Sequence, residues 1–273
     1  AISKKTGVGI IGSQKAVLSA NKVSNLAELI TVRIEGAVEG SGVIVQKDEN
    51  TYTVVTAWHV IKDNAPGEEI VAVTNDKRAH VVDGSSLKKI ENVDLGLLTF
   101  KSDSKYSHAL LGQASDSQSG ETLYVSGYPL SSTSVPIRVR RFTKGEVVAN
   151  TSTFMSNGYQ LLYSNQTLPG MSGGGVFDRY GRLIAIHGLA ETDIKLTTQT
   201  GLAVKTGTNQ GIPILQYLEP DTQQIKKEDP DKIDQKLVKI VQLLNIERPY
   251  DDGNRGYRFY FNGMEDEVIQ LTN

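Results

Sequence analysis

Cysteine is absent from all 273 residues of the sequence. Disulfide bonds, thiol nucleophiles and zinc sites built from cysteine are therefore excluded. No apolar run approaches the roughly 18 residues that a helix needs to cross a bilayer, so we expect no membrane span. An excess of one charge is also lacking, because 29 Lys and Arg stand against 31 Asp and Glu, for a net charge of −2. This balance gives no reason to expect a nucleic-acid partner.

What is present is typical of a soluble globular protein, with 38% hydrophobic and 22% charged residues. The chain starts at Ala1 rather than Met, which fits a mature product after signal removal and equally a trimmed chain. From this we expect a secreted or periplasmic location.

Most of the first 217 residues form short apolar, β-branched runs separated by turn residues, such as "ITVRIEG", "YTVVTA" and "RLIAIHG". Regular runs without helical patterns between them predict an all-β sandwich or barrel. The polar, Ser-rich stretch "QASDSQSG" divides the runs into two sets. We therefore predict four parts, the first three being an N-terminal extension over 1–27, a first β-barrel over 28–116 and a second β-barrel over 117–218.

The fourth part, 219–273, has a different composition. A charged stretch is followed by apolar residues at helical spacing: Ile233, Leu237, Ile240, Val241 and Leu244. Alternating aromatic residues over 257–261 then end at Asn262-Gly263, a dipeptide favoured in two-residue hairpin turns. The pattern predicts a linker, a helix and a terminal hairpin, a region that could contact a protein partner.

Two motifs are weak. The run "GVGIIG" over 7–12 matches the dinucleotide pattern G-x-G-x-x-G, but no βαβ unit surrounds it, and phosphate binding requires one. The run "RVRRFTK", which includes Arg138 and Arg140, could bind phosphate, but charged residues on the solvent face of a strand are the commoner case. Neither motif predicts a nucleotide or nucleic-acid site.

The stretch "LPGMSGGGVFD" surrounds Ser172 with glycine. A serine hydroxyl attacks a carbonyl only when a base lies within hydrogen-bond reach and a third group orients the base. Of four histidines, His59 ends the apolar run "YTVVTAWHVI", and Asp94 opens the run "DLGLLTF". Each residue alone is more often structural. Together, the chain order His59, Asp94, Ser172 is that of the chymotrypsin-type triad.

The segments "TAWH", "VDLGLL" and "GMSGG" resemble the signature segments of the trypsin-like (chymotrypsin-fold) serine proteases over roughly 28–218. The chain is most similar to the cysteine-free bacterial branch, including cyanobacterial trypsin-like peptidases. The resemblance implies two six-stranded antiparallel β-barrels with the site between them. It also implies peptide or protein substrates, no metal or organic cofactor, and an oxyanion hole formed by the backbone N–H groups of Gly170 and Ser172.

The resemblance further implies a pocket for the residue before the scissile bond, lined by Gln166, Thr167, His187, Gly188 and Gly211. No acid lies among them, so burial of a substrate Lys or Arg would cost energy. Glutamyl endopeptidases of the family bind the substrate carboxylate with a Thr or Ser five residues before the nucleophile and a His fifteen after it. Because Thr167 and His187 have this spacing, we predict a preference for Glu. The alternative is that His187 only hydrogen-bonds within the barrel.

Two departures from the family pattern affect these expectations. Met171 stands where animal enzymes have Asp, so an activating ion pair with a new N-terminus is not expected. Gly188 stands where a Trp is usual, which is expected to open the strand and change the depth of the pocket. The competing function is a protease-fold binding or regulatory module with latent or no peptidase activity.

Overall fold

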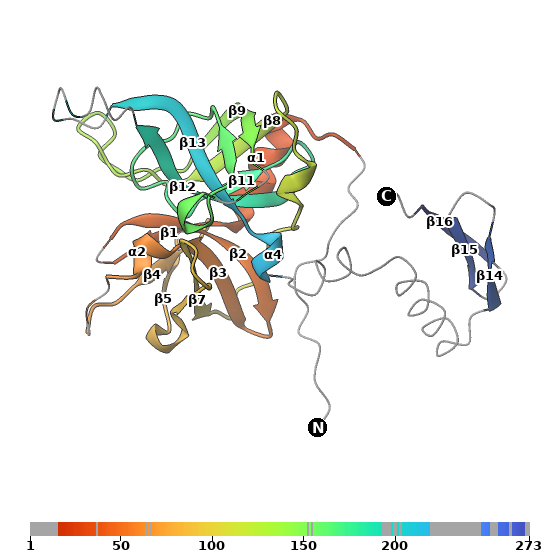
Figure 1. Cartoon of the computed structure of the whole chain (residues 1–273). Coiled ribbons are helices and arrows are strands. Elements are labelled where there is room, and N and C mark those ends of the chain that lie inside the picture. The colour runs from red at the N-terminus through yellow and green to blue at the C-terminus, as the bar shows by residue number, and fades with distance from the viewer. Residues whose placement is uncertain are drawn as a thin grey trace. The chain divides into compact units, whose positions relative to one another are not determined.

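The protein, studied as a computed structural model, is described over residues 16–36, 38–63, 65, 67–151, 153, 155–192, 198, 201, 204–218, 247–251, 256–261 and 264–270. Contacts between residues divide the chain into two compact units, Ala1–Glu219 and Pro220–Asn273. The first unit contains two β structures, coloured orange to yellow and green to cyan in Figure 1.

The first β structure is an antiparallel sheet of seven strands in the order β5-β4-β1-β2-β3-β7-β6. The strands are β1 (Thr31–Glu35), β2 (Gly40–Asp48), β3 (Thr51–Ala57), β4 (Val71–Val73), β5 (Ala79–Val81), β6 (Lys88–Lys89) and β7 (Leu95–Lys101). A single bridge between Val82 and Phe100 joins the segment after β5 to β7. β6 is a short edge strand of two exposed lysines, a type of edge that resists further pairing.

The second β structure is a closed barrel in the order β10-β13-β12-β11-β8-β9. Its strands are β8 (Thr122–Gly127), β9 (Arg141–Asn150), β10 (Leu161–Tyr163), β11 (Gly175–Phe177), β12 (Leu183–Thr192) and β13 (Lys205–Pro213). The predicted all-β double-barrel architecture is confirmed. The two halves differ in strand number, because β6 adds a seventh strand to the first sheet and the second barrel alone closes with six.

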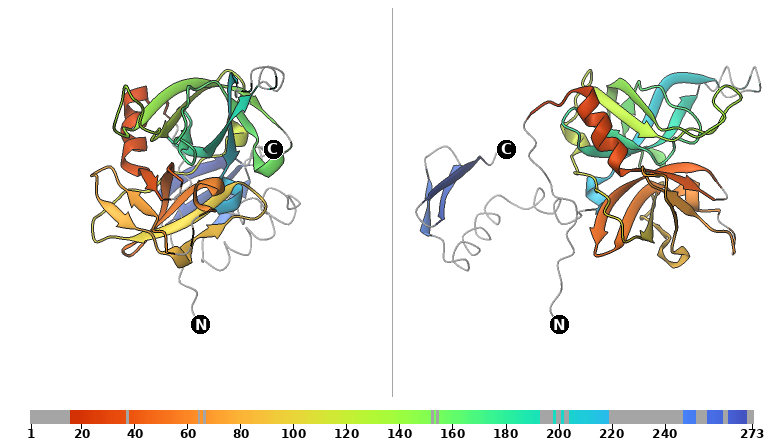
Figure 2. Two further views of the ribbon diagram at one scale, coloured as in Figure 1. Left: turned by 90° about the vertical axis from the view of Figure 1, so that its left-hand side faces the viewer. Right: turned by 180° about the vertical axis from the view of Figure 1, so that it is seen from behind.

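Helix α1 (Ala20–Ile30) was not expected from the sequence. Ser19 caps it by accepting a hydrogen bond from the Lys22 N–H at 3.4 Å. The side chains of Val23, Ala27 and Ile30 recur on one face and are buried. Figure 2 shows the helix beside the second barrel, where it contacts β8 and β11. Residues ahead of the first strand therefore contribute to the core.

The remaining helices named here, all within the described residues, are short. They are α2 (Trp58–Ile61), α4 (Leu215–Leu218) and three 3₁₀ turns, η1 (Gly84–Ser86), η2 (Ala114–Asp116) and η3 (Ser156–Gly158). Among the residues that the structure describes, no helix has the length and hydrophobicity needed to cross a membrane.

The second unit contains an antiparallel sheet of β14 (Glu247–Asp251), β15 (Gly256–Phe261) and β16 (Met264–Gln270). Phe261 pairs with Met264, so β15 and β16 form the predicted terminal hairpin, to which β14 adds a strand. The predicted helix over 233–244 and the run over 7–12 lie outside the described residues.

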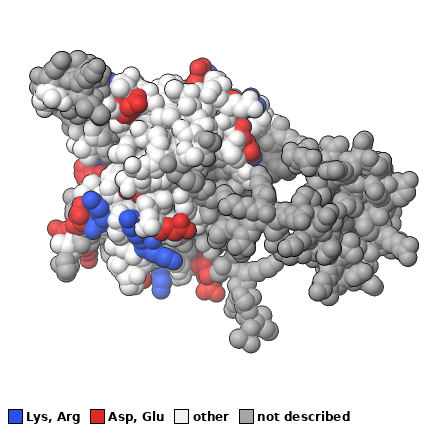
Figure 3. All heavy atoms as spheres, viewed as in Figure 1, with Lys and Arg blue, Asp and Glu red and all other residues white. Residues whose placement is uncertain are grey.

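Arg138 differs from the expectation for its motif. Its side chain is only 5% exposed, and the guanidinium donates hydrogen bonds to four backbone carbonyls, those of Ile34, Gly40, Tyr128 and Pro129. A solvent-facing position was the wrong interpretation here, because the carbonyls of both β structures converge on this cation. On the face shown in Figure 3, basic and acidic side chains of the described residues are intermixed.

Candidate active site

The register of two neighbouring strands brings His59 to Asp94. β3 and β7 are antiparallel, with Ala57 opposite Leu95. The residues that follow Ala57 must therefore meet the residue that precedes Leu95. The Trp58 N–H bonds to the Asp94 carbonyl at 3.1 Å, and the His59 N–H bonds to Asp94 Oδ1 at 2.9 Å.

Asp94 orients the imidazole of His59. His59 Nδ1 lies 2.7 Å from Asp94 Oδ2, and Tyr159 donates its hydroxyl to the same oxygen at 2.6 Å. Burial acts to raise the pKa of Asp94, but the hydrogen bonds from His59 and Tyr159 outweigh it, so the pKa lies below its ordinary value. An ionised carboxylate only accepts, so Nδ1 carries a proton and a neutral His59 keeps Nε2 as its proton acceptor.

Glycine is required on both sides of Ser172 by geometry. Gly170 has a φ of +90°, and a Cβ there would lie 2.6 Å from the Leu130 nitrogen. Gly173 has a φ of +85°, and a Cβ there would lie 2.0 Å from the Ser41 carbonyl oxygen. Left-handed backbone and close approach to other chain segments both exclude side chains.

This turn leaves two backbone donors available. Within the described residues, neither the Gly170 N–H nor the Ser172 N–H has a hydrogen-bond acceptor. The Pro169 carbonyl accepts from the Leu130 N–H at 2.8 Å. Because the C=O and N–H of a trans peptide point in opposite directions, the Gly170 N–H points away from Leu130. Unpaired N–H groups in a turn are the type of donor that stabilises an oxyanion.

Ser41, the fully buried second residue of β2, uses every polar atom it has in hydrogen bonds, and two of these bonds go to this turn. Its N–H bonds to the Ser172 carbonyl at 2.8 Å, and its hydroxyl donates to the Gly170 carbonyl at 2.9 Å. The hydroxyl accepts from the Tyr128 N–H at 2.8 Å, and the carbonyl accepts from Thr56 at 2.7 Å. Ser41 therefore fixes the peptide unit between the two available donors and the peptide unit that follows the Ser172 N–H.

Met171, which replaces the acid of animal relatives, is completely buried. Its side chain packs in the core of the second barrel with Leu123, Val125 and Val176. Apolar packing and the Ser41 hydrogen bonds together hold the turn around Ser172.

The Ser172 hydroxyl donates to the Gly188 carbonyl at 3.1 Å. Its turn contacts the end of β3, because a Cβ on Gly173 would lie 2.2 Å from Thr56 Oγ1, three residues before His59. The structure thus joins His59 to Asp94 directly and places the Ser172 turn against the end of β3, while the Ser172 hydroxyl itself bonds to the Gly188 carbonyl.

His187 lies inside the second barrel and is only 3% exposed. Its Nδ1 lies 2.7 Å from the hydroxyl of the equally buried Tyr163. Desolvation, followed by the positive charges of Lys205 and His59, lowers the pKa of His187 to about 3. His187 is therefore neutral at neutral pH.

The other predicted pocket residues have different environments. Thr167 is buried and donates its hydroxyl proton to Asn209 Oδ1 at 2.5 Å. Asn209 in turn donates from Nδ2 to the Asn165 carbonyl at 2.5 Å, which fixes its amide orientation. The Thr167 hydroxyl is thus committed to a protein acceptor. Gln166 is exposed, and Gly211 lies opposite His187 in the register of β12 and β13.

The space beside Gly188 is filled rather than open. A Cβ at this position would lie 2.1 Å from the hydroxyl oxygen of Tyr159. The expected opening of the strand is therefore wrong, because the ring of Tyr159 from the segment before β10 occupies the volume that a side chain at 188 would need.

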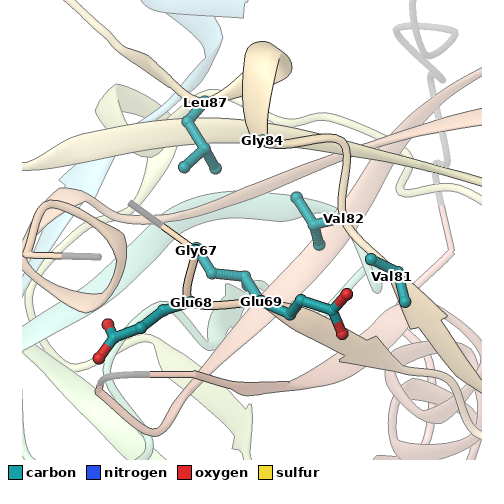
Figure 4. A pocket seen from close by; sticks show the side chains of 8 residues that line it. Gly67, Glu68, Glu69, Val81, Val82, Gly84 and Leu87 are labelled. Carbon is teal, nitrogen blue, oxygen red and sulfur yellow. The ribbon is translucent and has the colours of Figure 1, made fainter. Parts of the chain in front are cut away.

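Two other histidines have no part in this arrangement. His80 stacks on Phe100 with ring centroids 4.6 Å apart and lies 3.0 Å from the Tyr106 hydroxyl, whereas His108 is exposed. A cavity of about 320 Å³ in the first β structure contains no predicted site residue. Figure 4 shows Val82 and Leu87 along its wall and Glu68 and Glu69 at its edge.

Sequence reasoning missed several residues that support the site: Ser41, Tyr159, Tyr163, Lys205 and Asn209. The run "YQLLY" contained a usable signal, since a tyrosine that closes a buried strand needs a partner for its hydroxyl. Lys205, whose Nζ lies 3.5 Å from the Thr167 carbonyl, left no comparable signal.

Comparison of the chain with known proteins identifies similar sequences and a similar structure. Exfoliative toxin A of Staphylococcus aureus is 33% identical over 102 residues, which are 35% of this chain and 33% of the toxin. The serine protease Do-like HtrA of Lactococcus lactis subsp. cremoris (strain MG1363) is 26% identical over 189 residues, which are 67% of this chain and 45% of that protein. The chain thus spans less than half the length of either curated relative.

A solved structure, the HtrA-type protease AlgW with tripeptide, has a TM-score of 0.56 and 22% identity. The similarity covers 74% of this chain and 62% of that one, and it shows a shared fold. The family model for the trypsin-like peptidase domain matches residues 40–186. The chain therefore belongs to the trypsin-like peptidases, a family of serine proteases with a double β-barrel fold.

Proposed function

We propose that this protein hydrolyses peptide bonds through an acyl-enzyme, with Ser172 as nucleophile, His59 as general base and Asp94 as the group that orients the base. The observation that carries the proposal is the paired contact of Asp94 with the backbone and the imidazole of His59. It leaves His59 Nε2 as an acceptor. The serine turn, which contacts the end of β3, has two N–H donors without an acceptor among the described residues.

In the first step, the Ser172 Oγ–H bond breaks, its proton moves to His59 Nε2, and Oγ bonds to the substrate carbonyl carbon. The carbonyl oxygen becomes an oxyanion that accepts from the N–H groups of Gly170 and Ser172. His59 then protonates the departing amine as the peptide C–N bond breaks. Water then gives a proton to His59 Nε2 as its oxygen bonds to the acyl carbon, the bond from that carbon to Oγ breaks, and His59 returns the proton to Oγ as the carboxylic acid leaves.

A fluorophosphonate probe tests the nucleophile, because it phosphonylates serine only where a base and an oxyanion hole activate it. We expect a single labelled peptide containing Ser172, loss of labelling in Ser172→Ala, and loss of peptide hydrolysis in the same variant at a nearly unchanged melting temperature. Equal hydrolysis by wild type and Ser172→Ala would contradict the assignment.

The same experiment decides the competing function. A binding or regulatory module would have no need of an activated serine, and the hydrogen bond from Ser172 to the Gly188 carbonyl is a resting arrangement that a latent enzyme would also show. Absence of label with the fold intact favours the module. Label that appears only after addition of peptide favours latency.

We also propose a preference for Glu before the scissile bond. Lys205 supports it, because its ammonium lies against the Thr167 carbonyl, lowers the pKa of His187 by its charge, and has no ion-pair partner among the described residues. The Tyr163 hydroxyl lies 2.7 Å from His187 Nδ1 and 3.2 Å from the Gln210 carbonyl, so its single proton goes to one of the two. When Nδ1 receives it, the neutral ring keeps a proton on Nε2 for a substrate oxygen. Since Thr167 already donates to Asn209, Lys205 supplies the charge that separates Glu from Gln.

Paired substrates that differ only in Glu or Gln test this preference. We expect the wild type to favour Glu, and Lys205→Met to reduce the Glu-to-Gln ratio of kcat/KM by about tenfold, the size of one charge-assisted contact. Lys89→Met, which removes an exposed lysine of β6, is the matched control. Cleavage mainly after Lys, Arg or large apolar residues would refute the preference and leave His187 with a structural role.

Two further expectations remain proposals. A secreted or periplasmic location is tested by fractionation of the source cells. Contact of residues 219–273 with a protein partner is tested by crosslinking in the full chain.

A further inference from the structure

The carboxylate of Asp94 is held from two directions. His59 approaches it from the first β structure, with two hydrogen bonds. Tyr159 approaches it from the second, and its hydroxyl lies 2.6 Å from Oδ2 of Asp94 across a sequence separation of 65 residues. Tyr159 is only 1% exposed, so solvent does not compete for this hydrogen bond.

The short segment 157–159 is built around Asp94. Asn157 stands at a φ of +61°, and its carbonyl accepts from the Asp94 N–H at 2.9 Å. Two residues later, Tyr159 bonds to the carboxylate of the same aspartate. One turn therefore fixes both the backbone and the side chain of Asp94.

Gly188 provides the room for this contact. A Cβ at 188 would lie 2.1 Å from the Tyr159 hydroxyl oxygen and 2.8 Å from its ring. A side chain there would displace the tyrosine from Asp94. The glycine, the tyrosine and the aspartate therefore form one interlocking arrangement that spans the two β structures.

We propose that Tyr159 is a positioning residue of the catalytic apparatus, which holds the Asp94 carboxylate against His59 and limits how strongly that carboxylate attracts the imidazole proton. The proposal rests on the proposed role of Asp94 as the group that orients His59. Asp94 Oδ2 accepts from both His59 Nδ1 and Tyr159, so the two donors share its negative charge. Without the phenol, a larger share of this charge would act on the imidazole.

Few charged or titratable groups, among the described residues, lie around Asp94 and Tyr159. Asp94 faces His59 and Tyr159, and Tyr159 faces Asp94 and Tyr163. Farther away, the positive charges of Lys205 and His59 both lower the pKa of the buried His187. Burial and the nearby Asp94 raise the pKa of Tyr159 above its ordinary value, so the phenol stays protonated and remains a donor at neutral pH.

Tyr159→Phe keeps the buried ring and removes only the hydroxyl. In the Ser172→Ala background, proton NMR follows the Nδ1 proton of His59, identified by its absence from His59→Gln. We expect Tyr159→Phe to move the titration midpoint of this signal upward by roughly 0.3 to 1 pH unit, because a less neutralised carboxylate favours imidazolium. An unchanged midpoint would overturn the proposal.

Tyr163→Phe is the matched control, since it removes the hydroxyl of a second buried tyrosine that bonds to His187 rather than to Asp94. Its His59 midpoint should stay in place, and an equal shift in both variants would show a merely structural effect. If Tyr159→Phe does not fold, Gly188→Ala must produce the same upward shift by displacing the phenol.

Kinetics give a second readout. In an active enzyme, Tyr159→Phe should lower kcat about tenfold with little change in KM, and the acidic limb of kcat/KM should move upward with the NMR midpoint. An unchanged kcat and acidic limb would contradict the proposal. Failure of the proposed function is recognised separately, because a wild type without activity or label still yields the His59 titration.

Discussion

His187 shows how burial decides the chemistry of one residue. The ring lies in the second barrel beside Tyr163, and its pKa falls to about 3. A cationic His187 would have been an obvious partner for a glutamate substrate, but the structure provides a neutral ring. At this scale, the proposed preference for Glu therefore rests on the charge of Lys205 rather than on a cationic imidazole.

The same burial makes stability depend on pH. Between pH 6.5 and 3 an unfolded histidine binds a proton and the folded His187 does not, so the free energy of unfolding falls as pH falls through this window. From pH 7.5 to 4.5 this residue should remove about 3 kcal/mol, at roughly 1.4 kcal/mol per pH unit below 6.5. Urea unfolding of wild type and His187→Gln at both pH values measures the difference. Equal pH dependence in the two proteins would show that His187 is not held neutral.

At the scale of elements, the site depends on where strands begin and end. The last residue of β3 pairs with the first residue of β7, which brings His59 and Asp94 together at that end of the first sheet. The start of β2 supplies Ser41, whose hydrogen bonds hold the turn before β11. Strand ends are free of the pairing that occupies strand interiors, so their polar groups are available to support a site.

Ser41→Ala tests the support of the serine turn. It removes the donor to the Gly170 carbonyl and the acceptor of the Tyr128 N–H. Two hydrogen bonds of about 1 kcal/mol each correspond to a fall in kcat of roughly 10- to 100-fold, with KM nearly unchanged because the ground state gains little from the oxyanion donors.

The affinity of a peptide aldehyde, which forms an oxyanion with the active serine, should fall in parallel with kcat. Ser126→Ala is the control, since Ser126 is equally buried but bonds to Thr31. Similar losses in the two variants would indicate general destabilisation rather than loss of oxyanion geometry.

At the scale of the first unit, Arg138 joins the two β structures. Its guanidinium donates to carbonyls of Ile34 and Gly40 on one side and of Tyr128 and Pro129 on the other. Burial lowers the pKa of this guanidinium, and the four acceptors offset the cost of removing it from water.

Arg138→Met leaves four buried carbonyls with fewer donors. We expect a loss of about 3 kcal/mol in the free energy of unfolding, or roughly 6 to 12 °C in melting temperature for a domain of this size. The exposed Arg141 provides the control Arg141→Met, which should change stability little. Calorimetry of the two variants measures the effect, and a similar small shift in both would deny Arg138 this role.

The division of the chain into two compact units leads to a further prediction. The unit that ends at Glu219 contains every proposed catalytic residue. A variant that ends there should label with fluorophosphonate at a rate within about threefold of the full chain, because it keeps all of these residues. A threefold change in rate corresponds to less than 1 kcal/mol in the activation barrier. A much faster or slower rate would show that residues 220–273 regulate the site.

Much of this protein is determined by its sequence alone. Short β-branched runs predict strands, the glycines around Ser172 permit a backbone that other residues exclude, and the order of His59, Asp94 and Ser172 leads to the proposed mechanism. These are local properties, because conformational preference and residue order are carried by each segment separately.

Only the tertiary structure decided the supports of the site. Tyr159 meets Asp94 across 65 residues, Ser41 meets Gly170 across 129, and Arg138 meets Ile34 across 104. The position of Lys205 and the burial of His187 likewise depend on the pairing of β12 with β13. Such contacts are set by strand register and barrel closure, and since many residues of the same type are equally suited by local pattern, the sequence alone does not single out those that the fold brings together.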